Sequence, residues 1–223
     1  MPTEPTGRRP LKTREWPFFK NLAAGLARAG VTPNGISAAS IVFGCGAGAA
    51  FAATAHCDGW ALRACWFAAA LGIQLRLIAN LLDGMVAVEG RKGGPTGELW
   101  NEVPDRVSDA AIFIGAGYAS GSSPVLGFAA ALVAIFVAYV RALGASAGAG
   151  QCFLGPQAKP HRMALMTVVC VFSAIFPTYS TVIGERPLPV VVVALWIVIL
   201  GGLITAWRRL AFIAAFLRKK SHP

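Results

Sequence analysis

The sequence predicts an all-α integral membrane protein with six transmembrane helices and an N-terminal interfacial helix. Of its 223 residues, 56% are hydrophobic and only 13% are charged, whereas a soluble domain carries about a quarter of its residues as charged side chains. The mean hydropathy of +0.60 is far too apolar for a disordered chain. Several uncharged stretches also reach the length of about 20 residues that a helix needs to cross a bilayer.

Six such stretches follow one another along the chain. No charge occurs between Arg28 and Asp58, and the second stretch contains only Arg76. The third uncharged run is interrupted by Gly121-Ser122-Ser123-Pro124, a turn signal, and therefore predicts two helices. The expected spans are residues 36–55, 64–82, about 103 to this turn, this turn to about 147, 163–184 and 187–207.

These spans make residues 35–217 one membrane domain between two basic ends. Residues 1–34 are expected to form a cytoplasmic basic segment, and residues 218–223 a basic cytoplasmic tail. Trp16, Phe18 and Phe19 stand among basic residues at 14–30, which is typical of an interfacial helix, although a plain juxtamembrane anchor has the same composition. The first apolar run starts too late and is too long for a cleavable signal peptide.

The basic residues lie on one side of the predicted membrane domain. With six spans, both termini and the even-numbered loops share a side, and this side carries nearly all the Lys and Arg behind the net charge of +10. Only Arg63 and Arg186 fall on the other side. Because cytoplasmic loops carry the excess of Lys and Arg, we expect both termini in the cytoplasm and the protein in a bacterial inner membrane. Topology accounts for the charge, so we expect no nucleic-acid partner.

The five cysteines show no paired spacing. We expect them to act mainly as small buried apolar residues. Cys57 and Cys65 leave a bridge across one short loop open as an alternative.

The acidic residues, in contrast, are clustered. Because the second span runs into the cytoplasm and the third runs out of it, Asp83 and Asp105 are expected at the same membrane depth, free to face each other. Ionisable groups at this depth are costly, so a functional site is the default interpretation. Six of the ten acidic residues fall within one segment of the sequence: Asp83, Glu89, Glu98, Glu102, Asp105 and Asp109.

Helical periodicity places these acids on common faces. Asn80 and Asp83 share a stripe of the second helix with Arg76. If the third helix begins early, Asn101, Asp105 and Asp109 follow at intervals of four residues; Pro104 leaves open that the helix starts after Asn101. For Asp109 the alternative is that it only neutralises Arg76 or Arg106 inside the bundle.

Carboxylate and amide oxygens that converge from two helices suit a hard cation, Mg²⁺ or Mn²⁺, rather than zinc. The three histidines are dispersed and offer no competing ligand spacing. Glycines in the same region allow a bulky ligand to approach the backbone. Lys159 and Arg162, on the same side, can counter phosphate charge. Together these features indicate phosphoryl chemistry on a lipid.

These residues resemble the signature of the CDP-alcohol phosphotransferase family, D-x2-D-G-x2-A-R-x8-G-x3-D-x3-D, which bridges that family's second and third membrane helices. The spacing agrees without an insertion, and residues 32–37 resemble the family's entry into its first helix. The family's first and third aspartates are asparagines here, and its arginine is a valine. The corresponding positions are Asn80, Asp83, Gly84, Ala87, Val88, Gly97, Asn101 and Asp105.

The resemblance implies roles for these positions. Asp83, Asp105, Asn80 and Asn101 would hold divalent metal, and Asp105 would be the general base. Gly84, Ala87 and Gly97 would let cytidine approach the helices. The loss of two carboxylates is expected to weaken metal binding or to reduce two metals to one. The residues that can supply a missing carboxylate are Glu98, Glu102 and Asp109, and those that can bind phosphate, or serve only as cytoplasmic anchors, are Arg141, Lys159 and Arg162.

The expected function is the transfer of a phosphatidyl or other phospho-alcohol group from a CDP-linked lipid donor, by family analogy CDP-diacylglycerol, to an acceptor alcohol, with release of CMP, in phospholipid synthesis. A catalytically impaired member that serves as a lipid- or nucleotide-binding scaffold is the main alternative, and a small cation transporter a second. The motif Gly44-x-x-x-Gly48 permits close helix packing, either within the bundle or between the subunits of a homodimer.

Overall fold

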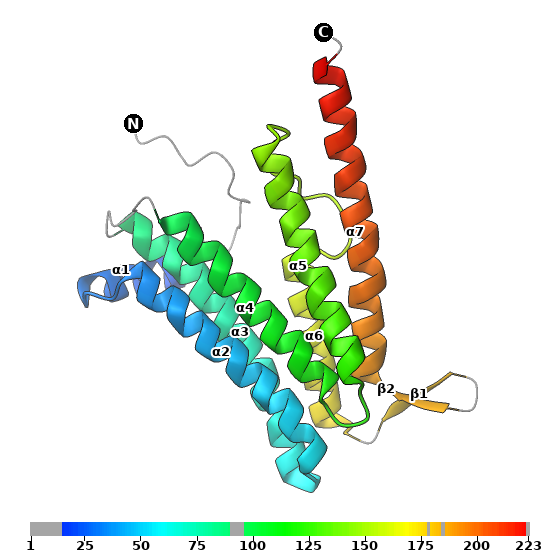
Figure 1. Cartoon of the computed structure of the whole chain (residues 1–223). Coiled ribbons are helices and arrows are strands. Elements are labelled where there is room, and N and C mark those ends of the chain that lie inside the picture. The colour runs from blue at the N-terminus through cyan, green and yellow to red at the C-terminus, as the bar shows by residue number, and fades with distance from the viewer. Residues whose placement is uncertain (1–14, 90–95, 178, 184–185, 222–223) are drawn as a thin grey trace.

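A computed structural model describes residues 15–89, 96–177, 179–183 and 186–221 of the chain. These residues form seven α-helices, a short 3₁₀ turn and a two-stranded hairpin (Figure 1). Arg91 and Lys92, which belong to the loop between the second and third predicted spans, lie outside the described residues, as do the outermost residues of both predicted basic ends. The helices are α1 Pro17–Arg28, α2 Pro33–Ala53, α3 Gly59–Glu89, α4 Gly97–Gly117, α5 Pro124–Ser146, α6 Lys159–Ile175 and α7 Val190–Ser221, and the strands are β1 Ser180–Ile183 and β2 Arg186–Pro189.

Proline and glycine set many of the helix limits. Pro33 and Pro124 occupy the first positions of α2 and α5, where the missing N–H is not needed and the fixed φ suits a helix. Thr32 caps α2, because its hydroxyl accepts a hydrogen bond from the Gly35 N–H at 3.1 Å. Gly121, with a φ of 69°, makes the turn between α4 and α5.

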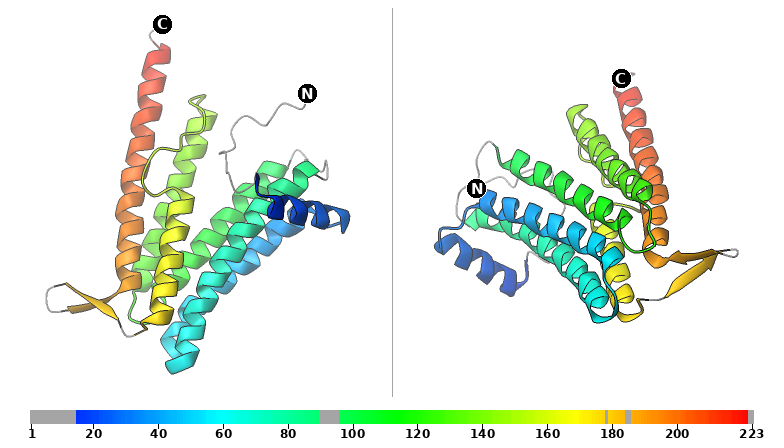
Figure 2. Two further views of the ribbon diagram at one scale, coloured as in Figure 1. Left: turned by 180° about the vertical axis from the view of Figure 1, so that it is seen from behind. Right: turned by 60° about the horizontal axis from the view of Figure 1, so that its bottom comes forward.

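The helices form two groups. In one, α2 packs on both α3 and α4; in the other, α5 and α6 pack on α7. Contacts of α4 with α5 and of α3 with α6 join the groups. Figures 1 and 2 show the two groups close together near the β-hairpin and diverging toward the end that carries the C-terminus. Phe51, Ile112, Phe113 and Leu195 are fully buried in the core between them.

Glycines set the closest approaches between helices. A Cβ on Gly115 would lie 2.2 Å from the Gly48 carbonyl oxygen, so the backbones of α4 and α2 are in direct contact. A Cβ built on Gly117 would likewise lie 2.7 Å from the Cα of Gly127, so α4 and α5 are also in direct backbone contact. Gly44 packs on Ser108. The motif Gly44-x-x-x-Gly48 is therefore used within the bundle, and its packing face is not available to a second subunit.

Four helical segments are long and apolar enough to cross a membrane: residues 33–56, 59–88, 124–146 and 190–220. They correspond to the predicted first, second, fourth and sixth spans, and they give the chain the character of an integral membrane protein. Helix α6 has only 17 residues, and α4 carries charged residues in its first half. These two helices occupy the places of the predicted third and fifth spans.

The predictions for the last two spans were wrong in their limits. Helix α6 ends at Ile175 instead of continuing to residue 184, because Pro177 follows it and the β-branched residues of 180–183 form strand β1. Strand β1 pairs antiparallel with β2, with Ser180 opposite Pro189. The fold is thus helical apart from this hairpin. Helix α7 begins at Val190, after the prolines of β2, and continues well past Trp207 to Ser221.

The cysteines follow expectation in part. Cys152 and Cys170 are buried, whereas Cys45 is exposed on α2. Cys57 and Cys65 are free thiols with their sulfur atoms 3.8 Å apart.

Candidate functional site

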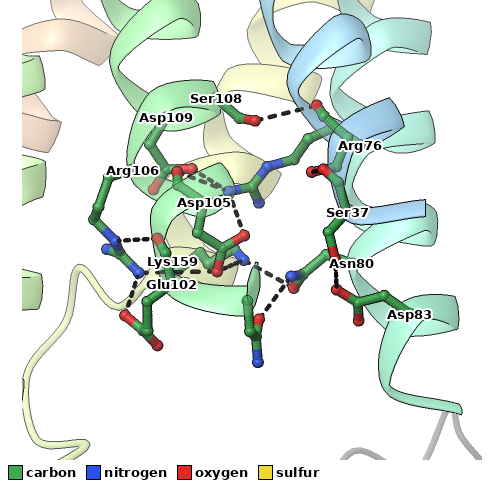
Figure 3. A network of polar contacts seen from close by, with 12 residues as sticks. Ser37, Arg76, Asn80, Asp83, Glu102, Asp105, Arg106, Ser108, Asp109 and Lys159 are labelled. Carbon is green, nitrogen blue, oxygen red and sulfur yellow. Dashed lines mark hydrogen bonds and ion pairs between the residues drawn. The ribbon is translucent and has the colours of Figure 1, made fainter. Parts of the chain in front are cut away.

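Four helix segments bring their polar side chains together in one cluster (Figure 3). They are the start of α2, the second half of α3, the first half of α4 and the start of α6. Most of the predicted site residues lie in this cluster, and two of them, Asn80 and Lys159, are hydrogen-bonded although they are 79 positions apart in the sequence. The pairing of α3 with α4 that the sequence predicts is therefore present, and α6 completes it.

Asp83 lies near the end of α3 with a 6% exposed side chain. One of its carboxylate oxygens accepts a hydrogen bond from the Ser37 hydroxyl at 2.8 Å, and the other accepts from the Gly84 N–H. Ser37 belongs to the first turns of α2, and it also donates to the Pro33 carbonyl at 3.1 Å. The sequence pattern marked residue 37 only as part of a helix entry, so its contact with Asp83 was not anticipated.

Asp105 is buried on α4 and surrounded by cations. Its Oδ1 accepts from the Arg76 guanidinium at 3.1 Å, and its Oδ2 from the Lys159 ammonium. Arg106 lies farther away, at 3.8 Å from Oδ2. The carboxylate is thus held between charges from α3 and α6.

The two asparagines at the aspartate positions contact each other. Asn80 Nδ2 donates to Asn101 Oδ1 at 3.1 Å, and Asn80 Oδ1 accepts from Lys159 at 2.9 Å. Helix α4 begins at Gly97 and continues through Pro104, so Asn101 lies on the helix and faces α3. Helix α4 therefore begins early enough to include Asn101 together with Asp105 and Asp109, which confirms the early start that their spacing predicted.

Asp109 lies one turn further along α4 and is 1% exposed. Its Oδ1 accepts from Arg76 at 2.5 Å and its Oδ2 from Arg162 at 3.0 Å. Asp109 is therefore paired with Arg76, as the alternative for this residue expected, whereas Arg106 makes its described ion pairs with Glu102 and Asp105. Arg162 was expected to bind phosphate, but at 2% exposure it is enclosed with Asp109. Sequence spacing carries no signal for this pair because α6 is distant along the chain.

Glu102 forms the outer edge of the cluster. Its two oxygens accept from Arg141 of α5 at 2.5 Å and from Arg106 at 3.0 Å. This places Glu102 away from the Asn80–Asn101 pair that it was expected to supplement. Glu98 lies on the first turn of α4, but its side chain is outside the described part of the structure.

The three small residues of the signature flank the cluster. Gly84 and Ala87 are half-buried near the end of α3, and Gly97 is exposed at the start of α4. Among the residues that the structure describes, no atom lies within 4 Å of a Cβ built on Gly97. The backbone at this position is therefore open to a ligand from outside the bundle.

The side-chain oxygens at the four signature positions are of the kind that binds a single hard cation. Asp83 and Asp105 supply carboxylate oxygens, and Asn80 and Asn101 supply amide oxygens, as Mg²⁺ and Mn²⁺ prefer. Among the residues that the structure describes, no three His, Cys, Asp or Glu side chains form a metal-binding group. The residues therefore offer two carboxylates where the family signature has four.

Comparison with known structures identifies the fold. The chain is similar to Mycobacterium tuberculosis phosphatidylinositol phosphate synthase (PgsA1) in complex with manganese and citrate, with a TM-score of 0.70 and 22% identity over 87% of this chain and 88% of that one. For the same enzyme with CDP-DAG bound, the TM-score is 0.69 at 21% identity, over 87% and 92% of the two chains. No family model matches the sequence, and no curated protein sequence matches it. At this identity the likeness shows a shared membrane-protein fold.

Proposed function

We propose that this chain is a CDP-alcohol phosphotransferase that transfers a phosphatidyl group from CDP-diacylglycerol to an acceptor alcohol and releases CMP. The observation that supports this best is the coincidence of two independent findings. The signature spacing at residues 80–105 is present in the sequence, and the same residues meet at one site of a fold shared with an enzyme solved with CDP-DAG bound.

In the proposed reaction, the acceptor hydroxyl oxygen attacks the phosphorus distal to cytidine. The bond between that phosphorus and the bridging diphosphate oxygen breaks, and CMP leaves with the bonding electrons. Asp105 takes the hydroxyl proton, a role that requires a carboxylate within hydrogen-bond reach. Arg76 and Lys159 fix the orientation of this carboxylate.

The remaining residues position the donor. The open backbone at Gly97, with Gly84 and Ala87, would face the cytidine. Asp83 and Asp105, with the amide oxygens of Asn80 and Asn101, would hold Mg²⁺ or Mn²⁺, which when bound neutralises diphosphate charge. Ser37 holds Asp83 in place by its 2.8 Å hydrogen bond. Arg141 lies at the outer edge of the cluster and would meet an acceptor or lipid phosphate.

We further propose that α4 and α6 complete six spans, with α1 as an interfacial helix and both termini in the cytoplasm of a bacterial cell. The support is the position of the basic residues. Arg141 lies toward the C-terminal end of α5, Lys159 begins α6, and Arg218, Lys219 and Lys220 lie in the last turn of α7. These helix ends point away from the hairpin (Figure 1), whereas Arg63 lies at the opposite end of the bundle, where it donates to the carbonyls of Ala174 and Ile175.

One observation favours the alternative of a binding scaffold that has lost catalysis. Asn80, Asn101 and Lys159 satisfy one another, which is a stable arrangement without any ligand. The transporter is disfavoured because the ion pairs of the cluster contain more cations than carboxylates.

Release of CMP decides between an enzyme and a scaffold. The full chain, purified in detergent, is incubated with labelled CDP-diacylglycerol, Mn²⁺ or Mg²⁺ and a panel of alcohols that includes inositol phosphate, glycerol phosphate and serine. We expect CMP release with one of them. Asp83→Asn should abolish it, while Asp58→Asn, at an exposed position of the opposite end, should leave it unchanged. Binding of CDP-diacylglycerol without CMP release with any alcohol would indicate the scaffold.

A further inference from the structure

Lys159 places a positive charge among the residues that match the metal-binding positions of the signature. Its ammonium donates to Asn80 Oδ1 at 2.9 Å and also to Asp105 Oδ2. Asn80 lies on α3, Asp105 on α4, and Lys159 is the first residue of α6. Three helices thus converge on one ammonium group, in the middle of the cluster in Figure 3.

The asparagines are oriented to receive this ammonium. Asn80 directs its amide nitrogen at Asn101 and its oxygen at Lys159. An amide has one acceptor oxygen, and its NH₂ group cannot coordinate a cation. With aspartate at both positions, the hydrogen bond between residues 80 and 101 would become a repulsion between carboxylates. The two asparagines and Lys159 therefore form a matched set.

The surrounding charge also favours an ammonium over a second divalent ion. The described ion pairs of the cluster join three carboxylates, Glu102, Asp105 and Asp109, to five cations, Arg76, Arg106, Arg141, Lys159 and Arg162. Asp83 adds one further carboxylate and has a hydroxyl and an N–H as hydrogen-bond donors. In the view of Figure 3, Asn80 lies between Asp83 and the Asp105–Lys159 pair.

We propose that the Lys159 ammonium occupies one of two cation positions in this site, so that the chain binds no more than one divalent ion, on the side of Asp83. The proposal rests on the proposed function for the identity of the site. Lys159 provides in covalent form the charge that a second ion would otherwise bring between Asn80 and Asp105. The one divalent ion would bind Asp83 and share the oxygens of Asp105, Asn80 and Asn101 with this ammonium.

Mn²⁺ binding to the purified full chain tests this assignment, with free Mn²⁺ measured by electron paramagnetic resonance. The wild type should bind at most one Mn²⁺ per chain. Lys159→Gln should bind Mn²⁺ at least tenfold more tightly, and Lys159→Arg, which keeps the charge, should remain within a few-fold of the wild type. Lys219→Gln, at an exposed position near the C-terminus, removes the same charge far from the site and should have no effect.

A second set of variants tests the number of ions. Asn80→Asp with Asn101→Asp should still bind one Mn²⁺ while Lys159 is present. Adding Lys159→Gln to this pair should give two, with the broadened resonance of two closely spaced Mn²⁺ ions. The proposal would be overturned if the wild type or the Asn80→Asp/Asn101→Asp variant bound two Mn²⁺ ions. It would also be overturned if Lys159→Gln bound Mn²⁺ with the same affinity as Lys219→Gln. Melting temperatures establish that each variant is folded. If Lys159→Gln does not fold, the Mn²⁺ binding of Lys159→Arg is compared with that of the wild type instead.

The metal count and the reaction are separate measurements. A chain that binds a single Mn²⁺ with the expected response to Lys159→Gln but never releases CMP would overturn the proposed function and support the role of Lys159. A chain that releases CMP and binds two Mn²⁺ would support the proposed function and overturn the role of Lys159.

Discussion

The two halves of α4 hold the bundle together by different means. From Gly97 to Asp109 the helix contacts its neighbours through ion pairs and hydrogen bonds. From residue 110 to Gly117 it carries no charge, and it approaches α2 and α5 through glycine backbone contacts. In the second half, a side chain at Gly115 or Gly117 would force a neighbouring helix to move, whereas the first half has side chains that can exchange partners. A ligand can therefore be accommodated by re-pairing at one end while the other end keeps the helices in register.

The largest expected effect belongs to the charged half and concerns chemistry. Asp105→Ala should reduce CMP release about 1000-fold, about 4 kcal/mol of transition-state stabilisation, because a general base is removed. Binding of CDP-diacylglycerol should be retained. Turnover and substrate binding are measured on the same preparation. Turnover within tenfold of the wild type would show that the base is another residue.

Asp109→Asn should act on stability instead. It leaves the buried Arg162 without its carboxylate and the buried Arg76 with Asp105 alone, and breaking a buried ion pair costs about 3 kcal/mol or more. The melting temperature in detergent should fall, with turnover per folded molecule reduced far less than in Asp105→Ala. Unchanged stability with abolished turnover would assign the catalytic role to Asp109, and would contradict the alignment of Asp105 with the last aspartate of the signature.

In the glycine half, Gly115→Ala should cost about 1–3 kcal/mol of stability by overpacking. The new methyl group would lie 2.2 Å from the Gly48 carbonyl oxygen, which is backbone and cannot rotate away. Gly46→Ala is the matched control, since a Cβ there contacts nothing within 4 Å. Thermal unfolding of both variants gives the comparison; equal melting temperatures would mean that α2 and α4 are not in direct contact.

The smallest effect is expected at the edge of the charged half. Glu102→Gln removes the pairs with Arg106 and Arg141, in which all three side chains are partly exposed. Exposed ion pairs contribute about 1 kcal/mol or less, so the melting temperature should hardly change. A loss as large as that of Asp109→Asn would place Glu102 among the structural ion pairs.

The sequence was sufficient to predict the parts of this comparison that depend on local pattern. Uncharged runs located the helices, and the spacing of Asp83 and Asp105 indicated that α3 and α4 meet at one site. The hairpin was missed because the residues on either side of Glu185 and Arg186 continue the uncharged runs of the fifth and sixth predicted spans, and only the prolines mark where the helices stop. The contacts of Lys159 with Asp105, and of Arg162 with Asp109, depend on where α6 packs. No pattern within a single helix encodes that position.

Helix α7 has a consequence for how a lipid substrate would reach the site. Its 32 residues extend about 48 Å at 1.5 Å per residue, and a hydrocarbon core of about 30 Å would accommodate the helix from Val190 to about Arg209. Arg209 donates to the carbonyls of Val137 and Leu154, both at 3.0 Å, and Leu154 lies just before the start of α6. The start of α6, and with it Lys159, would then lie near the level of the lipid phosphates. A diacyl substrate would arrive by lateral diffusion within the leaflet, with its tails never leaving the hydrocarbon, so that turnover would respond to its surface density and not to its bulk concentration.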